Sequence, residues 1–156
     1  HFPSCMASSL LEHFERGLTL QRAGDSYAAL AEYQTFLDAA QQFEVAPHTY
    51  AEVYCNIGTI HARHKHREAA RIHFEKALNC RELSSAYVNL ALLSLAQSSE
   101  NVKNGEVQKA QLALQEASVH CARVLELKDD SVSLSTAQRL LRDIDRFKAA
   151  CATSAQ

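Results

Sequence analysis

The sequence has 156 residues, which suits one domain with a buried core, because a chain of this size buries roughly two-thirds of its unfolded surface. Apolar residues make up 47% and charged residues 22%, and the formal net charge of −2 provides no basic field for nucleic acid or an anionic membrane. No run approaches the ~20 apolar residues of a transmembrane helix. Neither nucleic-acid binding nor membrane insertion is therefore expected.

Helical periodicity runs along most of the chain. Only 4 Gly and 2 Pro are present, too few turn formers for a sheet protein with many hairpins. The pattern predicts about seven helices, over residues 7–23, 26–43, 48–64, 67–80, 84–97, 106–128 and 131–150. Their connections are short, so consecutive helices are expected to pack as antiparallel hairpins. Asp25, after Gly24, is the expected N-cap of the second helix.

The clearest hairpin lies between Tyr50 and Cys80. Its first helix carries an apolar face formed by Tyr54, Ile57, Gly58 and His61, and its second carries one formed by Ala70, Phe74, Ala77 and Leu78. A glycine in the middle of a helix costs about 1 kcal/mol relative to alanine, so it indicates close approach of a neighbouring helix. Ala70 and Ala77 are small enough to meet Gly58 there.

The same spacing recurs in the earlier part of the chain. Gly17 precedes Ala29 by the same interval as Gly58 precedes Ala70. The interval from Gly17 to Gly58 is longer than the one from Gly58 to Ala91, which indicates that the second helix of this copy, or its loop at 46–47, is extended.

A third copy is expected to start at Tyr87, with Leu90 and Ala91 in the positions of Ile57 and Gly58. Its second helix could be set by Ala110, Leu114 and Ala117 or by Ala117, Cys121 and Val124. Both choices insert residues into this copy, in the polar run 98–104.

The middle copy reads Tyr54-x2-Ile57-Gly58-x2-His61, then Ala70-x3-Phe74-x2-Ala77, and resembles the tetratricopeptide repeat. The resemblance implies an all-α, right-handed superhelical stack of helix hairpins. Three hairpins are expected over residues 7–128, after a tail or cloning remnant at 1–6. A capping helix and tail are expected over 129–156, with a polar outer face formed by Arg139, Arg142, Asp143, Asp145 and Arg146.

The resemblance also implies that the first helix of each hairpin lines a concave groove for a partner's peptide. Helical geometry, with asparagine positions from the same resemblance, selects the predicted groove residues. They are Phe14, Leu18, Arg22, Cys55, Asn56, Thr59, Arg63, Val88, Asn89 and Leu92. This lining is apolar enough that two alternatives stay open: it binds an apolar or amphipathic peptide, or the C-terminal helix or a second subunit covers it.

The favoured function is a protein–protein adaptor that binds a peptide or helical segment of its partner. The alternatives are a structural or self-associating subunit whose groove is filled by its own C-terminal helix, and a chaperone-tail-binding co-chaperone. The missing lysines on the first helices of copies one and three argue against the last. No phosphate-binding loop, GxSxG or HExxH motif is present, so no enzymatic activity, cofactor or metal is expected.

Two further features concern chemistry. The odd number of cysteines and the absence of CxxC favour a reducing compartment, cytoplasmic or another intracellular one, with the helical cysteines acting as small apolar side chains. The five are Cys5, Cys55, Cys80, Cys121 and Cys151. A histidine-rich basic turn spans residues 61–67. It is interpreted as a solvated loop, with a metal site or a pH-dependent contact with an acidic partner as alternatives.

Overall fold

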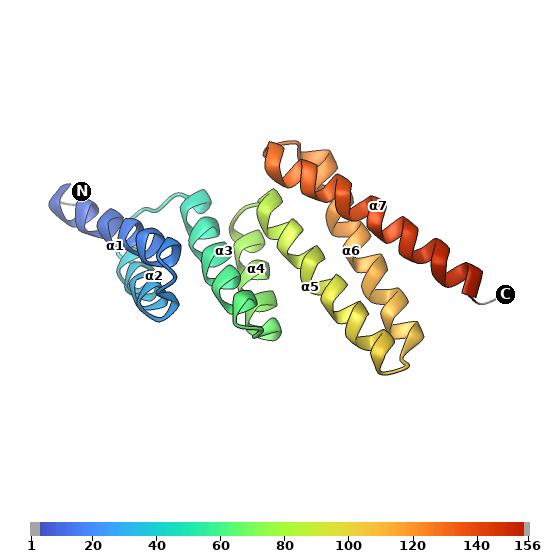
Figure 1. Ribbon diagram of the computed structural model, residues 1–156. Helices are drawn as coiled ribbons and strands as arrows, with labels where there is room; N and C mark the ends of the chain where they lie inside the picture. The colour runs from blue at the N-terminus through green and yellow to red at the C-terminus, as the bar shows by residue number, and fades with distance from the viewer. Residues whose placement is uncertain (1–3, 155–156) are drawn as a thin grey trace. The chain divides into compact units, whose positions relative to one another are not determined.

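The computed structural model describes residues 4–154, and the side chains of residues 8–150, as α-helices joined by short turns and loops without a β-strand (Figure 1). The seven helices are α1 (Ser4–Arg22), α2 (Ser26–Ala40), α3 (Pro47–Arg63), α4 (Arg67–Cys80), α5 (Ser84–Lys103), α6 (Val107–Leu127) and α7 (Ser131–Ser154). The predicted all-α class and the number of helices are confirmed. α1 begins at Ser4, inside the segment predicted to be a tail.

The chain divides into two compact units, residues 1–82 and 83–156. In the first unit, α1 pairs with α2, α3 pairs with α4, and α3 also packs against α2. In the second unit, α5 pairs with α6, and α7 packs against both helices of this hairpin. Each unit has a core of its own, built from the apolar stripes of its helices.

The turns of the three hairpins share one backbone geometry. The second residue of each turn is left-handed, with φ of 86° at Gly24, 61° at Lys65 and 74° at Gly105. In the first turn the next residue, Asp25, accepts a hydrogen bond from the amide of Ala28, as an N-cap does. Glycine adopts positive φ without strain, whereas a lysine at this φ costs about 1 kcal/mol.

A glycine facing an aromatic ring joins the two helices in each hairpin of the first unit. A Cβ atom added to Gly17 would lie 2.5 Å from the Tyr33 ring, and one added to Gly58 would lie 2.7 Å from the Phe74 ring. Both rings are fully buried. Close approach at Gly58 was predicted, but its expected partners were the small alanines, and that detail is wrong: a large ring fills the space.

The third hairpin has the same geometry at a different place from the one predicted. α5 continues to Lys103, so the expected end at residue 97 and the insertion at 98–104 are wrong. Ser98 corresponds to Gly58 in two respects. Each lies seven residues before the left-handed residue of its turn, which is Gly105 or Lys65. Each also lies twelve residues before a buried alanine of the second helix, which is Ala110 or Ala70. The Ser98 hydroxyl donates to the carbonyl of Ala110 at 2.9 Å. Ser98, and not Ala91, therefore stands at the small-residue position.

The extra length of this hairpin lies at its open end, away from the turn. α6 extends to Leu127, and both residue sets considered for it lie on its buried face: Ala110, Leu114, Ala117, Cys121 and Val124. The loop at residues 41–46, between α2 and α3, is extended, as one of the two expected alternatives had it. With Ser98 at the small-residue position, however, the 41 residues from Gly17 to Gly58 nearly equal the 40 from Gly58 to Ser98, because α5 has three more residues before Ser98 than α3 has before Gly58. The loop between α4 and α5 spans only residues 81–83.

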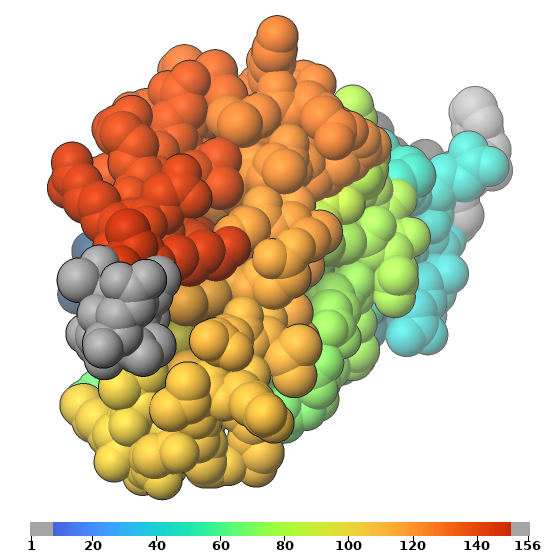
Figure 2. All heavy atoms as spheres, turned by 90° about the vertical axis from the view of Figure 1, so that its right-hand side faces the viewer, coloured from blue at the N-terminus to red at the C-terminus, as the bar shows by residue number. Residues whose placement is uncertain are grey.

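The last helix, α7, completes the core of the second unit. Ala137, Leu140 and Ile144 of α7 pack in one cluster with residues of α5 and α6. In Figure 2 the atoms of α7 (orange-red) lie directly against those of α6 (orange). The five charged residues predicted to form the outer face of this helix are all exposed.

Replacing Gly58 with Ala tests the contact between glycine and ring. We expect a net loss of about 1 kcal/mol, because overpacking costs about 1–3 kcal/mol and helix propensity returns about 1 kcal/mol. In the third hairpin Leu114 follows Ser98 by the same interval as Phe74 follows Gly58. The double variant Gly58→Ala/Phe74→Leu should therefore lose less than the sum of the single changes. Urea unfolding followed by circular dichroism measures all three, and strict additivity would show that the ring does not limit the space.

Candidate functional site

The predicted groove residues of α1 differ in how much of each side chain is available. The ring of Phe14 is half-buried and packs against the rings of Tyr33 and Phe36, with centroids 6.4 and 5.8 Å away. Leu18 is half-buried and Arg22 is exposed at the end of the helix. Phe14 thus takes part in the core of the first unit, while Leu18 and Arg22 retain surface for a partner.

The predicted residues of α3 follow the same division. Cys55 is 6% exposed, whereas Asn56 and Thr59 are half-buried and Arg63 is exposed. The Thr59 hydroxyl donates to the carbonyl of Cys55 at 3.0 Å, so it is held against its own helix. The accessible atoms on this face of α3 are therefore mainly those of Asn56, Thr59 and Arg63.

Asn56 also has a structural contact, with the buried phenol of Tyr33. The Tyr33 hydroxyl donates to the side-chain carbonyl of Gln21 at 2.6 Å, and Asn56 hydrogen bonds to the same phenol. Burial raises the pKa of Tyr33 to about 12, and the hydrogen bond from Asn56 opposes this rise. Asn56 therefore joins α3 to the first hairpin and is not simply a group kept for a ligand.

In the second unit, the predicted groove residues lie on α5. Val88 is 8% exposed and belongs to the core cluster shared with α7. The side-chain amide of Asn89 donates to the carbonyl of Ser85 at 2.8 Å, and Leu92 is 41% exposed. Of these three, Leu92 offers the most surface to a partner.

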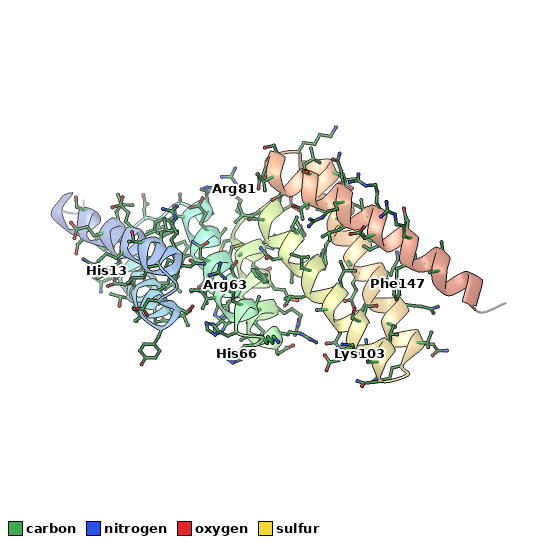
Figure 3. All side chains as sticks on the ribbon, viewed as in Figure 1. His13, Arg63, His66, Arg81, Lys103 and Phe147 are labelled. Carbon is green, nitrogen blue, oxygen red and sulfur yellow. The ribbon has the colours of Figure 1, made fainter. Side chains whose placement is uncertain are left out.

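Sequence analysis missed a small apolar cleft between α5 and α7. Its volume is about 160 Å³, and it is lined by Leu95, Ser98, Ser99, Leu114, Asp143, Ile144 and Phe147. Figure 3 labels Phe147 on α7. Relative to Ser98, Leu95 and Ser99 occupy the sequence positions that the predicted groove residues Cys55 and Thr59 occupy relative to Gly58. The interval from Ser98 to Ala110 equals that from Gly58 to Ala70, and this match could have identified Leu95 and Ser99 as equivalents of the predicted groove residues.

Each first helix also ends in an exposed cation at an equivalent position. Arg22, Arg63 and Lys103 follow Gly17, Gly58 and Ser98 by one common interval, and all three are exposed. The expectation that the first helix of the third copy carries no lysine is wrong, because α5 does not end at residue 97 but continues to Lys103. A basic residue in the last turn of a helix interacts favourably with the helix dipole, and it is also a ready partner for a carboxylate.

The histidine-rich turn brings four imidazoles together, as the sequence suggested for three of them. The centroids of His61 and His73 are 5.2 Å apart, those of His61 and His66 are 6.0 Å apart, and those of His64 and His66 are 6.3 Å apart. Figure 3 labels His66 at the turn between α3 and α4. Burial, and then repulsion from the other three rings, lowers the pKa of His61. The neutral ring of His61 therefore contributes stability that is present above the ordinary histidine pKa and is lost as the pH falls through the lowered pKa of His61.

The next features concern possible metal ligands and the reactivity of the cysteine thiols. Within residues 8–150, no three His, Cys, Asp or Glu side chains are placed to hold a metal ion. Burial raises the pKa of the Cys121 thiol to about 11 and also raises that of Cys80, so both are protonated at neutral pH and are poor nucleophiles. The side chains of Cys5 and Cys151 lie outside the described residues.

A hydrogen bond and an ion pair to Glu32 of α2 hold α1 against α2 beside the groove residues. The Nδ1 atom of His13 lies 2.6 Å from a carboxylate oxygen of Glu32, and Arg16 lies 3.3 Å from the other oxygen. The hydrogen bond to His13, followed by the charge of Arg16, lowers the pKa of Glu32. Arg16 occupies the position where the repeat pattern has a large apolar residue, and this ion pair takes the place of apolar packing there.

Paired helices with a recurring small residue, a recurring spacing and a shared turn define the class of helical repeat proteins. The tetratricopeptide repeat family matches residues 6–83, half of the chain, and the protein belongs to this family. No curated protein sequence matches the chain significantly. Among the described residues, none of the helices combines the length and the apolar composition needed to cross a membrane.

The change Tyr33→Phe tests the phenol that connects the first hairpin to α3. Removal of this buried hydroxyl, which is hydrogen bonded to Gln21 and Asn56, should lower the unfolding free energy by about 1 kcal/mol. The tyrosine absorbance near 295 nm should also lose the contribution of this phenol, whose pKa burial raises to about 12. Because folding raises this pKa, the contribution of the neutral phenol to stability is complete below pH ~10 and disappears as the pH rises further. An unchanged alkaline titration would contradict the assignment.

Proposed function

We propose that this protein is an adaptor that recognises a partner protein by docking a peptide or helical segment on the first helices of its hairpins. Family membership supports the general role, because tetratricopeptide repeats typically act as interaction modules without catalytic activity. The observation that carries the proposal further is the exposed cation that ends each first helix, at Arg22, Arg63 and Lys103. Carboxylate groups of a bound segment would meet the cations of the unit on which the segment docks, Arg22 and Arg63 in the first unit or Lys103 in the second.

The remaining surface of the first helices suggests an amphipathic partner segment. In the first unit, Leu18 offers apolar surface, while Asn56 and Thr59 can hydrogen bond to a peptide backbone. In the second unit, Leu92 and the cleft beside Phe147 suit an apolar side chain. A segment that combines apolar side chains with carboxylates would use both kinds of group. Residues 7–128 are proposed to form the three repeats and residues 129–156 their cap.

Thr59→Glu tests this docking face. It places bulk and negative charge beside Arg63 without removing a core side chain, so repulsion should weaken binding of an anionic segment at least about tenfold. The matched control is Asn79→Glu, an equal change of charge at an exposed position of α4. Partners are captured with the unmodified protein, and their affinities for all three proteins are then measured by calorimetry. If the unmodified protein, Thr59→Glu and Asn79→Glu bind the partner with equal affinity, the partner does not dock on this face.

A second candidate function follows from the packing of α7. Val88 was predicted to line the groove but is covered in the core that α7 completes. This favours a self-contained structural subunit in which the C-terminal helix takes the place of a partner segment. Of the two, the adaptor is better supported, because Leu92 and the cleft between α5 and α7 are left accessible.

Deletion of residues 131–156 separates the two candidates. For the adaptor, we expect a lower melting temperature and binding of a hydrophobic dye, because Leu114, Cys121 and Val124 lose their cover, and we expect no gain in partner binding. For the self-contained subunit, deletion would instead uncover a docking face and increase binding. Partner affinity and dye fluorescence, measured on the full and shortened chains at the same temperature, distinguish these outcomes.

A further inference from the structure

A second groove in the first unit is formed by α2, α4 and a different side of α3 from the one that carries the proposed docking residues Asn56 and Thr59. It has a volume of about 450 Å³ and lies between α2 and the hairpin of α3 and α4. On the α2 side it is lined by Tyr27, Leu30 and Gln34, and on the other side by Ile57, His61 and His73. We call it the histidine groove. It combines an apolar floor with two imidazoles, and no carboxylate of the described residues lines it.

The apolar part of the histidine groove is open to a partner side chain. Tyr27 is 87% exposed, an unusual state for a large aromatic residue, and its ring stands at the edge of the groove. Tyrosine is enriched where proteins bind one another, because its ring gives apolar contact and its hydroxyl can still hydrogen bond. Leu30 and Ile57 supply the aliphatic surface beside it.

The hydrogen bond of His73 determines which of its ring nitrogens is basic. Its Nδ1 atom lies 2.8 Å from the carbonyl oxygen of Ala69, and a carbonyl only accepts, so Nδ1 carries the proton. The lone pair of the neutral ring is therefore on Nε2. The rings of His73 and His61 are 5.2 Å apart, so a single anionic group could interact with both.

The charged groups around these two histidines are mostly positive. The turn contributes His64 and His66, in ring contact with His61 or with each other, together with Lys65. From α3, Tyr54 faces His73 with centroids 6.4 Å apart, and the ammonium of Lys76 on α4 lies 5.8 Å from the Tyr54 ring. A bound anion would therefore meet an environment that attracts it.

The carboxylates near the histidine groove are engaged with other side chains. On α2, Asp38 accepts a hydrogen bond from the amide of Gln34 at 2.9 Å. On α4, Glu68 and Glu75 both pair with Arg71. On α3, Glu52 pairs with His48. The four histidines instead repel one another when protonated, which helps to lower the pKa of His61. A bound carboxylate would relieve that repulsion.

We propose that the histidine groove binds an acidic segment of a partner protein, with an aliphatic side chain against Leu30 and Ile57 and a carboxylate at His61 and His73. The carboxylate stabilises the imidazolium form of the two histidines, so binding takes up protons from the solvent and strengthens as the pH falls. A rise of about one in the pKa of a histidine on binding corresponds to about a tenfold gain in affinity. This site shares α3 with the proposed docking face but uses another side of that helix, so each can be tested without the other.

The test uses a synthetic peptide in which leucines alternate with pairs of glutamates, and a matched peptide in which every glutamate is glutamine. Binding to the full chain is followed by NMR through the imidazole C–H signals, and affinity is measured at pH 7.5 and pH 5.5. We expect the glutamate peptide to move the C–H signals of both His61 and His73, to raise the pKa of His61, and to bind about tenfold more tightly at the lower pH. The glutamine peptide should do neither.

Three variants locate the site. His61→Gln and His73→Gln should each reduce both the affinity and its pH dependence, while His120→Gln, at a histidine of α6 in the other unit, should change neither. The proposal is overturned if the two peptides bind alike, if neither shifts the signals of His61 and His73, or if the three variants behave identically. It is also overturned if Zn²⁺ alone shifts those signals while the glutamate peptide does not. If a variant does not fold, the comparison of the glutamate and glutamine peptides on the unmodified protein still tests whether the groove binds an acidic segment.

Discussion

The two hairpins of the first unit depend on the fit between a glycine and an aromatic ring. Gly17 and Gly58 have no Cβ, so the rings of Tyr33 and Phe74 lie against the backbone of the opposite helix. This contact determines how closely the two helices of a hairpin can pack, and therefore where their other faces point. The positions of Leu18 and Thr59 on one side, and of His61 on the other, follow from it. A buried ring cannot move aside, so this spacing is rigid.

In the second unit a different pair of side chains has the same role. Ser98 replaces the glycine and Leu114 replaces the ring, and the serine hydroxyl is satisfied by the carbonyl of Ala110. A buried hydroxyl without such a partner would cost about 1–3 kcal/mol. The repeat geometry therefore does not require glycine. It requires a small residue whose polar atoms, if any, are hydrogen bonded within the hairpin.

The fold could be predicted because helix periodicity and short connections leave few alternatives. The middle hairpin was placed correctly, since Gly58, Ala70 and Phe74 together fix a register. The third was not, because α5 is apolar on most sides and Ala91 satisfies the small-residue pattern as well as Ser98 does. For the candidate site, helical geometry selected faces of α1 and α3 on which Leu18, Arg22 and Arg63 retain surface, and their role in binding stays a prediction. Helical geometry could not show that Cys55 and Val88 are buried, because that depends on neighbouring helices far away in the sequence.

Lys65 stands where the other two hairpins have a glycine, and its left-handed backbone costs about 1 kcal/mol. A glycine there would make a more stable turn but would carry no charge. The hairpin of α3 and α4 thus keeps a cation beside its histidines at the expense of backbone strain. The electrostatic potential at this end of the unit is consequently sensitive to ionic strength, so added salt would weaken its attraction for anions while leaving the packing of the rings unchanged.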